Sequence, residues 1–120
     1  MYIPKEDGVH RVSEIFTGIA DFEGIDELIY TSNYIARISY NITVKNGVMT
    51  DLTGYSFEMQ NIDFASLKSV TSNKGLSNTG ASVTTNYTME RTISETILGV
   101  TINMYTVETT DWCCLLTHFE

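Results

Sequence analysis

The carboxyl end of the chain gathers the residue types that most often do chemistry. Residues 112–119 read WCCLLTHF and hold both cysteines and one of the two histidines. A thiolate beside an imidazole is an activated nucleophile, and both groups bind zinc. In a strand, however, Cys114 and His118 would lie about 13 Å apart, because each residue advances the chain by about 3.3 Å. That separation is too large for a catalytic pair.

This segment therefore predicts a structural core strand, in which a free cysteine behaves as a small hydrophobe. The alternative is a small enzyme or a metal site that uses Cys114 and His118, and it lacks a second pair of ligands at zinc spacing. We accordingly expect no enzyme, no cofactor and no metal. Since Cys113 and Cys114 are adjacent, they cannot close a useful disulfide, and they give no sign of an oxidising compartment.

Acidic residues are concentrated in the first third of the chain. An EF-hand is a poor match there, because Ile25 and Leu28 interrupt the spacing of oxygen ligands that calcium requires. A surface that contacts a basic partner fits better, with carboxylates for attraction and tyrosines as anchors. The predicted partner-binding residues are Asp21, Glu23, Asp26, Glu27, Tyr30 and Tyr34.

Length and charge limit the class of protein. At 120 residues, 42% of them hydrophobic, the chain fits a single domain that covers residues 1–120. Its 15 acidic and 7 basic residues give a net charge of −8, which disfavours direct binding to nucleic acid. No apolar run is long enough to span a bilayer, and the first residues lack a secretory signal. We therefore expect a cytoplasmic protein without a membrane partner.

The middle and the end of the sequence predict β-structure. Apolar residues alternate with polar ones over 38–44, and Asn46-Gly47 then marks a tight hairpin turn. In the return strand the alternation changes phase near Gly54, which predicts a β-bulge there. Residues 86–97 alternate again, and we expect a turn or bend at Gly99 and another turn just before Trp112.

Three other segments predict helix or loop. Apolar residues recur at helical spacing at Val9, Val12, Ile15, Phe16 and Ile19. Residues 25–30 favour a further short helix, so we expect one or two short helices before Asn33. Residues 61–70 suit one or two helical turns, and the polar stretch 71–82 resembles a long functional loop. The expected fold is thus α+β, with about five antiparallel strands in one sheet and short helices, mostly amino-terminal.

A non-enzymatic protein-binding module fits these features best. The leading hypothesis is an inhibitor of the kind that phages encode, which occludes a basic surface of a host defence protein such as a nucleic-acid-binding enzyme. The alternative is a virion or assembly protein that forms homo-oligomers through its long hairpins. The small enzyme that uses Cys114 and His118 is the least supported of the three.

Overall fold

The protein is built from strands. The computed structural model describes residues 1–120, except for the side chains of Ile97 and Ile102. Over this described backbone 82% of residues are in strands and none is helical. The strands are β1 (Tyr2–Ile3), β2 (Gly8–Glu23), β3 (Ile29–Lys45), β4 (Val48–Ile62), β5 (Ser66–Leu76), β6 (Gly80–Ile97) and β7 (Val100–Phe119).

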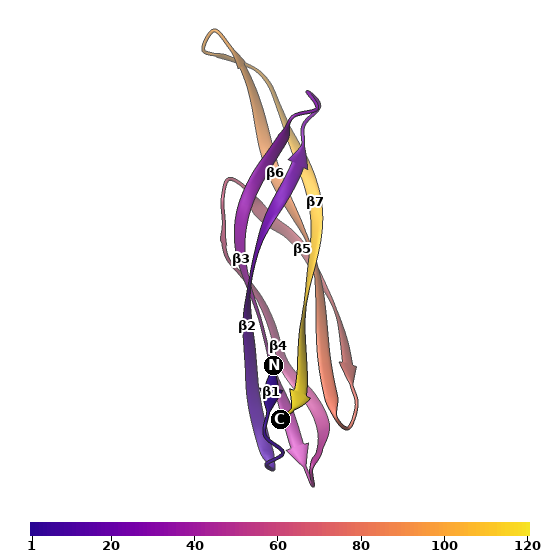
Figure 1. Cartoon of the computed structure of the whole chain (residues 1–120). Helices are drawn as coiled ribbons and strands as arrows, with labels where there is room; N and C mark the ends of the chain where they lie inside the picture. The colour runs from indigo at the N-terminus through magenta and orange to yellow at the C-terminus, as the bar shows by residue number, and fades with distance from the viewer.

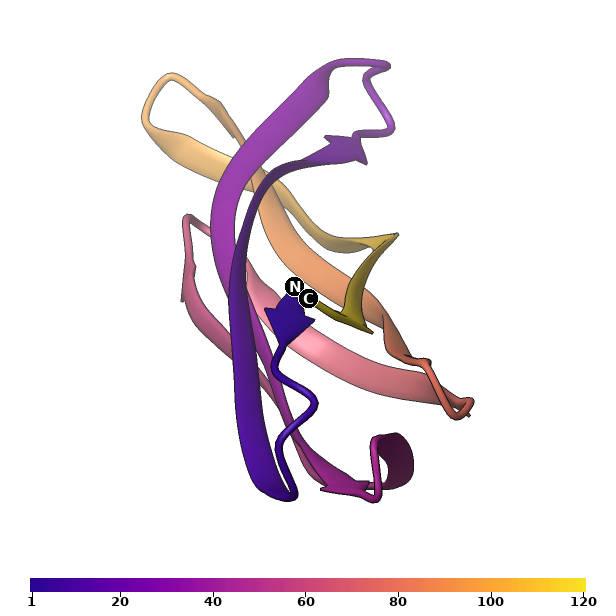
Figure 2. The same ribbon diagram turned by 60° about the horizontal axis from the view of Figure 1, so that its bottom comes forward.

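These strands form two sheets that face each other as a sandwich (Figure 1). One sheet has the order β1-β7-β6-β5 and the other β2-β3-β4, and every pairing is antiparallel except that of β1 with β7. The chain termini lie side by side (Figure 2), because the amide of His118 donates to the carbonyl of Met1. We call the opposite end of the molecule, where the β2–β3 turn and the β6–β7 hairpin lie, the distal end.

The sandwich is long and narrow. It measures 69 × 19 × 18 Å, and its radius of gyration is 19.1 Å. A compact domain of this length would have a radius of gyration of about 14 Å. The two layers therefore share a narrow interior that extends along the length of a rod.

Alternation along β3 and β6 builds this interior. From Ser32 to Val44 every even-numbered side chain of β3 is buried, and from Ala81 to Met89 every odd-numbered side chain of β6 is buried. Successive residues of a strand point to opposite faces, so each strand contributes one side to the core. The apolar alternation predicted over 38–44 and 86–97 is confirmed as strand.

The expected α+β fold is wrong. Residues 9–19 belong to β2, and their apparent helical stripe combines side chains from both faces of that strand. Val12 is buried, whereas Val9, Ile15 and Ile19 are 65%, 51% and 61% exposed. An exposed isoleucine cannot be told from a buried one in the sequence, so apolar residues on both faces of a strand can imitate a period of 3.6.

The other helix and loop predictions are also wrong. Residues 24–28 form a turn, and 61–70 hold the end of β4, a short bend and the start of β5. The polar stretch 71–82 is mostly strand, since β5 runs to Leu76 and β6 begins at Gly80. The turn expected before Trp112 is absent from the described backbone, because β7 is continuous there. Instead of the expected single sheet of five strands, there are two sheets, of four and three strands.

Three local predictions are confirmed, and one of them is the turn at Gly99, which joins β6 to β7. Asn46 and Gly47 have φ angles of 54° and 78°, and they join β3 to β4 in a two-residue turn with Lys45 opposite Val48. The ladder slips by one residue between Ser39 and Asn41, where Gly54 on β4 has a φ of 63°. Two further slips along β4 were not expected from the sequence.

A glycine also governs how β2 packs on β3. Gly18 lies opposite Tyr34, and a Cβ added to Gly18 would lie 2.4 Å from the Cζ of the Tyr34 ring. Because Gly18 has no Cβ, the ring of Tyr34 can lie directly over its backbone.

Replacing this glycine should destabilise the fold. We expect Gly18→Ala to lower the free energy of unfolding by about 2 kcal/mol, because the ring must move from a packed position. Urea denaturation measures the change. Gly80→Ala is the matched control, since its added Cβ would approach no atom closer than 3.5 Å. Equal stabilities for the two variants would contradict this packing.

Candidate functional site

The predicted acidic residues lie together at the distal end. Asp21 and Glu23 are among the last residues of β2, and Asp26 and Glu27 are in the turn that leads to β3. All four side chains are exposed. We call these four residues the acidic collar.

Hydrogen bonds fix the turn that carries the collar. The amide of Gly24 donates to the carbonyl of Leu28 over 2.9 Å, and Asp26 accepts from the amide of Leu28 over 3.1 Å. The Tyr30 hydroxyl donates to the other Asp26 carboxylate oxygen over 2.9 Å, and this bond raises the pKa of Tyr30. Asp26 therefore shapes the turn, while the carboxylates of Asp21, Glu23 and Glu27 have no hydrogen-bond partner among the described residues.

The turn is docked onto the β6–β7 hairpin by residues that the sequence did not single out for this role. The Ile25 amide donates to the Tyr105 hydroxyl over 3.1 Å. Arg91 donates to the Thr31 carbonyl over 2.8 Å, and its guanidinium lies 5.5 Å from the centre of the Tyr30 ring. In the sequence, only the position of Arg91 on the otherwise apolar face of the strand over 86–97 could have indicated this role. Arg91 thus bonds to neutral groups of the fold, and among the described residues it forms no ion pair with a carboxylate of the collar.

The β6–β7 hairpin continues beyond this docking point. Thr96 pairs with Thr101, and a tight turn follows at Leu98 and Gly99, whose φ angles are 50° and 79°. Residues 96–104 contain no charged side chain, and we call them the apolar arm. Leu98 is 98% exposed, and Val100 and Met104 are also exposed. Figure 1 shows the arm extending past the β2–β3 turn.

Apolar side chains of the β2–β3 turn extend this surface. Ile25, Leu28 and Ile29 are all exposed. Single exposed apolar side chains are common on proteins, whereas several that lie next to one another often mark a contact surface. The distal end thus combines an apolar arm, an apolar turn and an acidic collar.

Tyr34, the second predicted anchor, lies inside the molecule. Its side chain is 5% exposed, and its hydroxyl is 2.7 Å from that of Tyr87 and donates to Asp111 over 2.5 Å. The two tyrosine rings meet edge to face, with their centroids 5.6 Å apart. This position gives Tyr34 a role between the sheets, whereas the half-buried Tyr30 remains at the surface.

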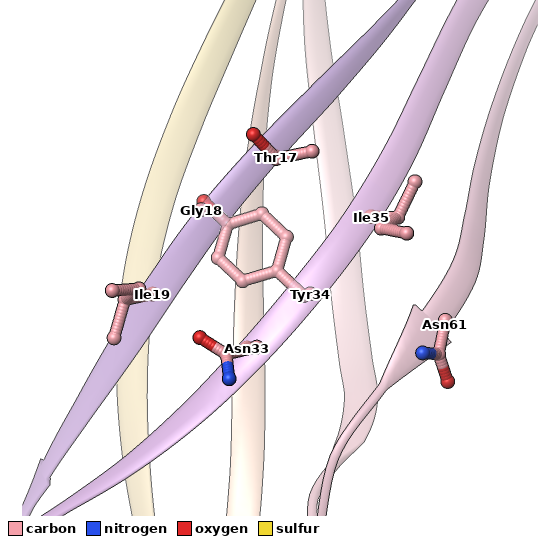
Figure 3. Close-up of a pocket in the computed structure, with 7 residues that line it drawn as sticks. All are labelled: Thr17, Gly18, Ile19, Asn33, Tyr34, Ile35 and Asn61. Carbon is pink, nitrogen blue, oxygen red and sulfur yellow. The ribbon is translucent and has the colours of Figure 1, made fainter.

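A hollow of about 430 Å³ lies beside Tyr34 on the three-stranded sheet. Figure 3 shows the Tyr34 ring lying across Gly18, with Ile19, Ile35 and the amides of Asn33 and Asn61 around it. The lining contains no carboxylate, histidine or cysteine. It therefore offers contact area and hydrogen-bonding groups, and no acid–base pair.

The carboxyl-terminal cluster forms a strand, as predicted, and its two faces differ. Cys113 and Leu115 are buried in the core. Cys114 is on the outer face, where its sulfur accepts a hydrogen bond from Thr84 over 3.3 Å, and His118 is exposed beside Tyr2. Of the two sulfurs and the imidazole, only the Cys113 sulfur is in the core. Among the residues whose side chains are described, no three His, Cys, Asp or Glu residues lie close enough to hold a metal ion.

Comparison with known proteins gives no relative: no family model, curated protein or solved structure matches the chain. Among the described residues, the structure contains no helical segment with the length and apolar character that crossing a bilayer requires. Function must therefore be argued from the geometry of this chain alone.

The buried tyrosines make stability depend on alkaline pH. Burial, and the hydrogen bond to Asp111, raise the pKa of Tyr34 from 10.0 to about 12, and burial also raises the pKa of Tyr87. The unfolded chain therefore loses these protons first, and the free energy of unfolding should fall as the pH rises from about 10 to about 12. Urea midpoints across this range should fall less steeply for Tyr34→Phe than for the parent. The exposed control Tyr2→Phe should keep the parent slope, and equal slopes for all three proteins would contradict the assignment.

The two cysteines should differ in reactivity. Burial raises the pKa of the Cys113 thiol to about 11, so at about pH 8 roughly one thiol in a thousand is ionised. Cys114 is partly exposed. Iodoacetamide should give the native protein a single adduct, at Cys114, and a second adduct only after denaturation, as mass spectrometry of peptides can establish. Two adducts formed at equal rates on the native protein would contradict the burial of Cys113.

Proposed function

We propose that the chain is a non-enzymatic protein-binding module whose contact surface is the distal end. One observation carries this proposal: the apolar arm projects beyond the sandwich with no strand of the opposite sheet opposite the exposed Leu98. An isolated two-stranded hairpin is only marginally stable in water. A partner that covers this uncharged arm would bury its apolar side chains and so stabilise it.

The collar indicates which partner surface fits. Asp21, Glu23 and Glu27 carry negative charge beside the arm, and the nearby cation Arg91 is already bound within the fold. A complementary partner would offer an apolar groove with basic residues along its rim. The carboxylates would steer the approach and the arm would provide most of the buried area.

Occlusion is the mode of action that follows from this complementarity. Basic residues gathered on one face are what a nucleic-acid-binding protein uses for its own ligand. The distal end would cover that surface sterically, and the protein would thereby inhibit its partner. Tyr30 remains a candidate contact, and Tyr34 is left out of the contact surface because it is buried.

A second candidate is an assembly subunit, and the β5 edge favours it. β5 pairs only with β6, and ten of its eleven residues are exposed. Open strand edges pair readily with other chains. Two copies that met at their distal ends would bring two collars of like charge together, so self-association would use the β5 edge instead. The mass in solution separates the candidates: a monomer fits the binding module, and rings or filaments fit assembly.

The binding proposal predicts a specific pattern of variants. A partner captured on the parent protein should bind Leu98→Ser/Val100→Ser roughly 10- to 100-fold more weakly, because both apolar contacts are lost. Glu23→Gln/Glu27→Gln should bind more slowly, with a weaker salt dependence. Association and dissociation rates at two salt concentrations measure both effects.

The control for these variants is Ile15→Ser. Ile15 is exposed on the outer face of β2, away from the distal end, so this variant should bind like the parent. A loss of affinity in Ile15→Ser equal to that of the arm variant, or unchanged affinity in the arm variant, would exclude the distal end as the contact surface.

A further inference from the structure

The outer face of the four-stranded sheet carries no charge over much of its lower half. The pairing register places residues 69–75 of β5, 80–88 of β6 and 110–118 of β7 side by side. The side chains of these segments that point away from the core are Ser, Thr, Asn or Gly on β5 and β6, and Thr110, Trp112, Cys114, Leu116 and His118 on β7. We call this surface the uncharged face.

The absence of charge on this face contrasts with the composition of the whole chain. The chain as a whole has 15 acidic and 7 basic residues. At the upper border of the face, Glu90 lies opposite Glu108, and Lys68 forms an ion pair with Glu108. Below that ion pair, no Asp, Glu, Lys or Arg points outward from the three segments, all of whose side chains are described. A phosphate, a uronic acid or a charged peptide would find no lysine, arginine or carboxylate to pair with here.

The uncharged face is also shaped. Gly75 and Gly80 have no side chains, and they leave a hollow of about 320 Å³ bordered by Leu76, Leu116 and His118. At its lower edge the rings of Tyr2 and His118 lie 6.3 Å apart, and the Tyr2 side chain is exposed. At the upper side Trp112 is 63% exposed, with its ring in solvent rather than in the core.

Much of the hydrogen-bonding capacity of the face is unused within the fold. Thr88 bonds with Thr110 and Thr84 with Cys114, both across neighbouring strands. By contrast, Ser82, Asn86 and Asn73 have no side-chain hydrogen bond to any described residue. Hydroxyl and amide groups both donate and accept, so they can match the alternating donors and acceptors of a polyhydroxylated ligand.

From these features we infer that the uncharged face binds a neutral oligosaccharide along β7. The ring of Trp112 would stack on the apolar C–H face of one sugar, since an aromatic face attracts such positively polarised hydrogens. The hollow at Gly75 and Gly80 would hold a second sugar beside Leu116. The span from Trp112 to His118 is about 20 Å along the strand, which suits an extended ligand of several sugars.

Other occupants fit this chemistry less well. Nucleic acid needs lysine or arginine, and the face has neither. The core of a protein interface is apolar and aromatic, whereas Ser, Thr and Asn dominate here. A second copy of this chain would have to place two protruding Trp112 rings against polar strands. This site lies away from the distal end, so the inference is independent of the proposed function.

The single tryptophan gives a direct test. Because Trp112 is the only tryptophan in the chain, its fluorescence reports on this face alone. The full-length protein would be titrated with cellohexaose, maltohexaose, mannohexaose and chitohexaose, and with heparin as the charged comparison. We expect a saturable change in emission with at least one neutral hexasaccharide and none with heparin.

Calorimetry with the same sugar then tests the residues. Trp112→Ala should weaken binding about tenfold, and it should fold normally because the side chain is exposed. Leu98→Ser, at the distal end, should bind like the parent. Failure of all four sugars, equal binding of heparin, or unchanged affinity in Trp112→Ala would overturn the inference. A change in emission that follows protein concentration and dimer mass without sugar would assign the face to a second copy instead, and would also overturn it.

Discussion

Three tyrosine hydroxyl groups of the three-stranded sheet reach across the sandwich and hydrogen-bond to the four-stranded sheet. Tyr34 bonds to Tyr87 and Asp111, Tyr40 to the Leu115 carbonyl and Thr117, and Tyr55 to Thr85. Their rings supply apolar area and their hydroxyls are paired, so burial leaves no polar atom of these side chains unsatisfied. Because each bond joins a residue of one sheet to a residue of the other, together they fix how the two layers lie on each other. The rest of the molecule depends on this alignment.

The surfaces available for binding are the outer faces of the sheets and the end of the molecule where one sheet no longer covers the other. In the middle of the rod each sheet covers the inner face of the other, and the outer faces carry whatever the sequence places there. Between Tyr105 and its turn at Leu98 and Gly99, the β6–β7 hairpin has no strand of the other sheet facing it. The apolar side chains Leu98, Val100 and Met104 are therefore exposed. The collar sits beside it because the β2–β3 turn is docked on Arg91 and Tyr105. One end of the molecule is therefore apolar and acidic, while a face nearer the termini is uncharged.

The sequence predicted those strands in which one face is buried and the other polar. The segment 38–44 and the Asn46-Gly47 turn could be recognised because burial, alternation and turn geometry agree there. β2 could not, since Ile15 and Ile19 are exposed, and β5 could not, since neither of its faces is buried. The grouping of the four acids followed from their spacing. The projection of the arm did not, because alternation along a strand carries no information about where the opposite sheet stops.

Hydrogen exchange of the free protein tests most directly whether the tyrosine-linked sandwich leaves the arm uncovered. Residues 36–42 of β3 pair with β2 throughout and, except at Tyr40, with β4, so their amides should exchange slowly. Amides of residues 96–104 should exchange at rates close to those of an unprotected peptide. Protection of the arm equal to that of β3 in the monomer would mean that another part of the chain covers it, and would contradict this account.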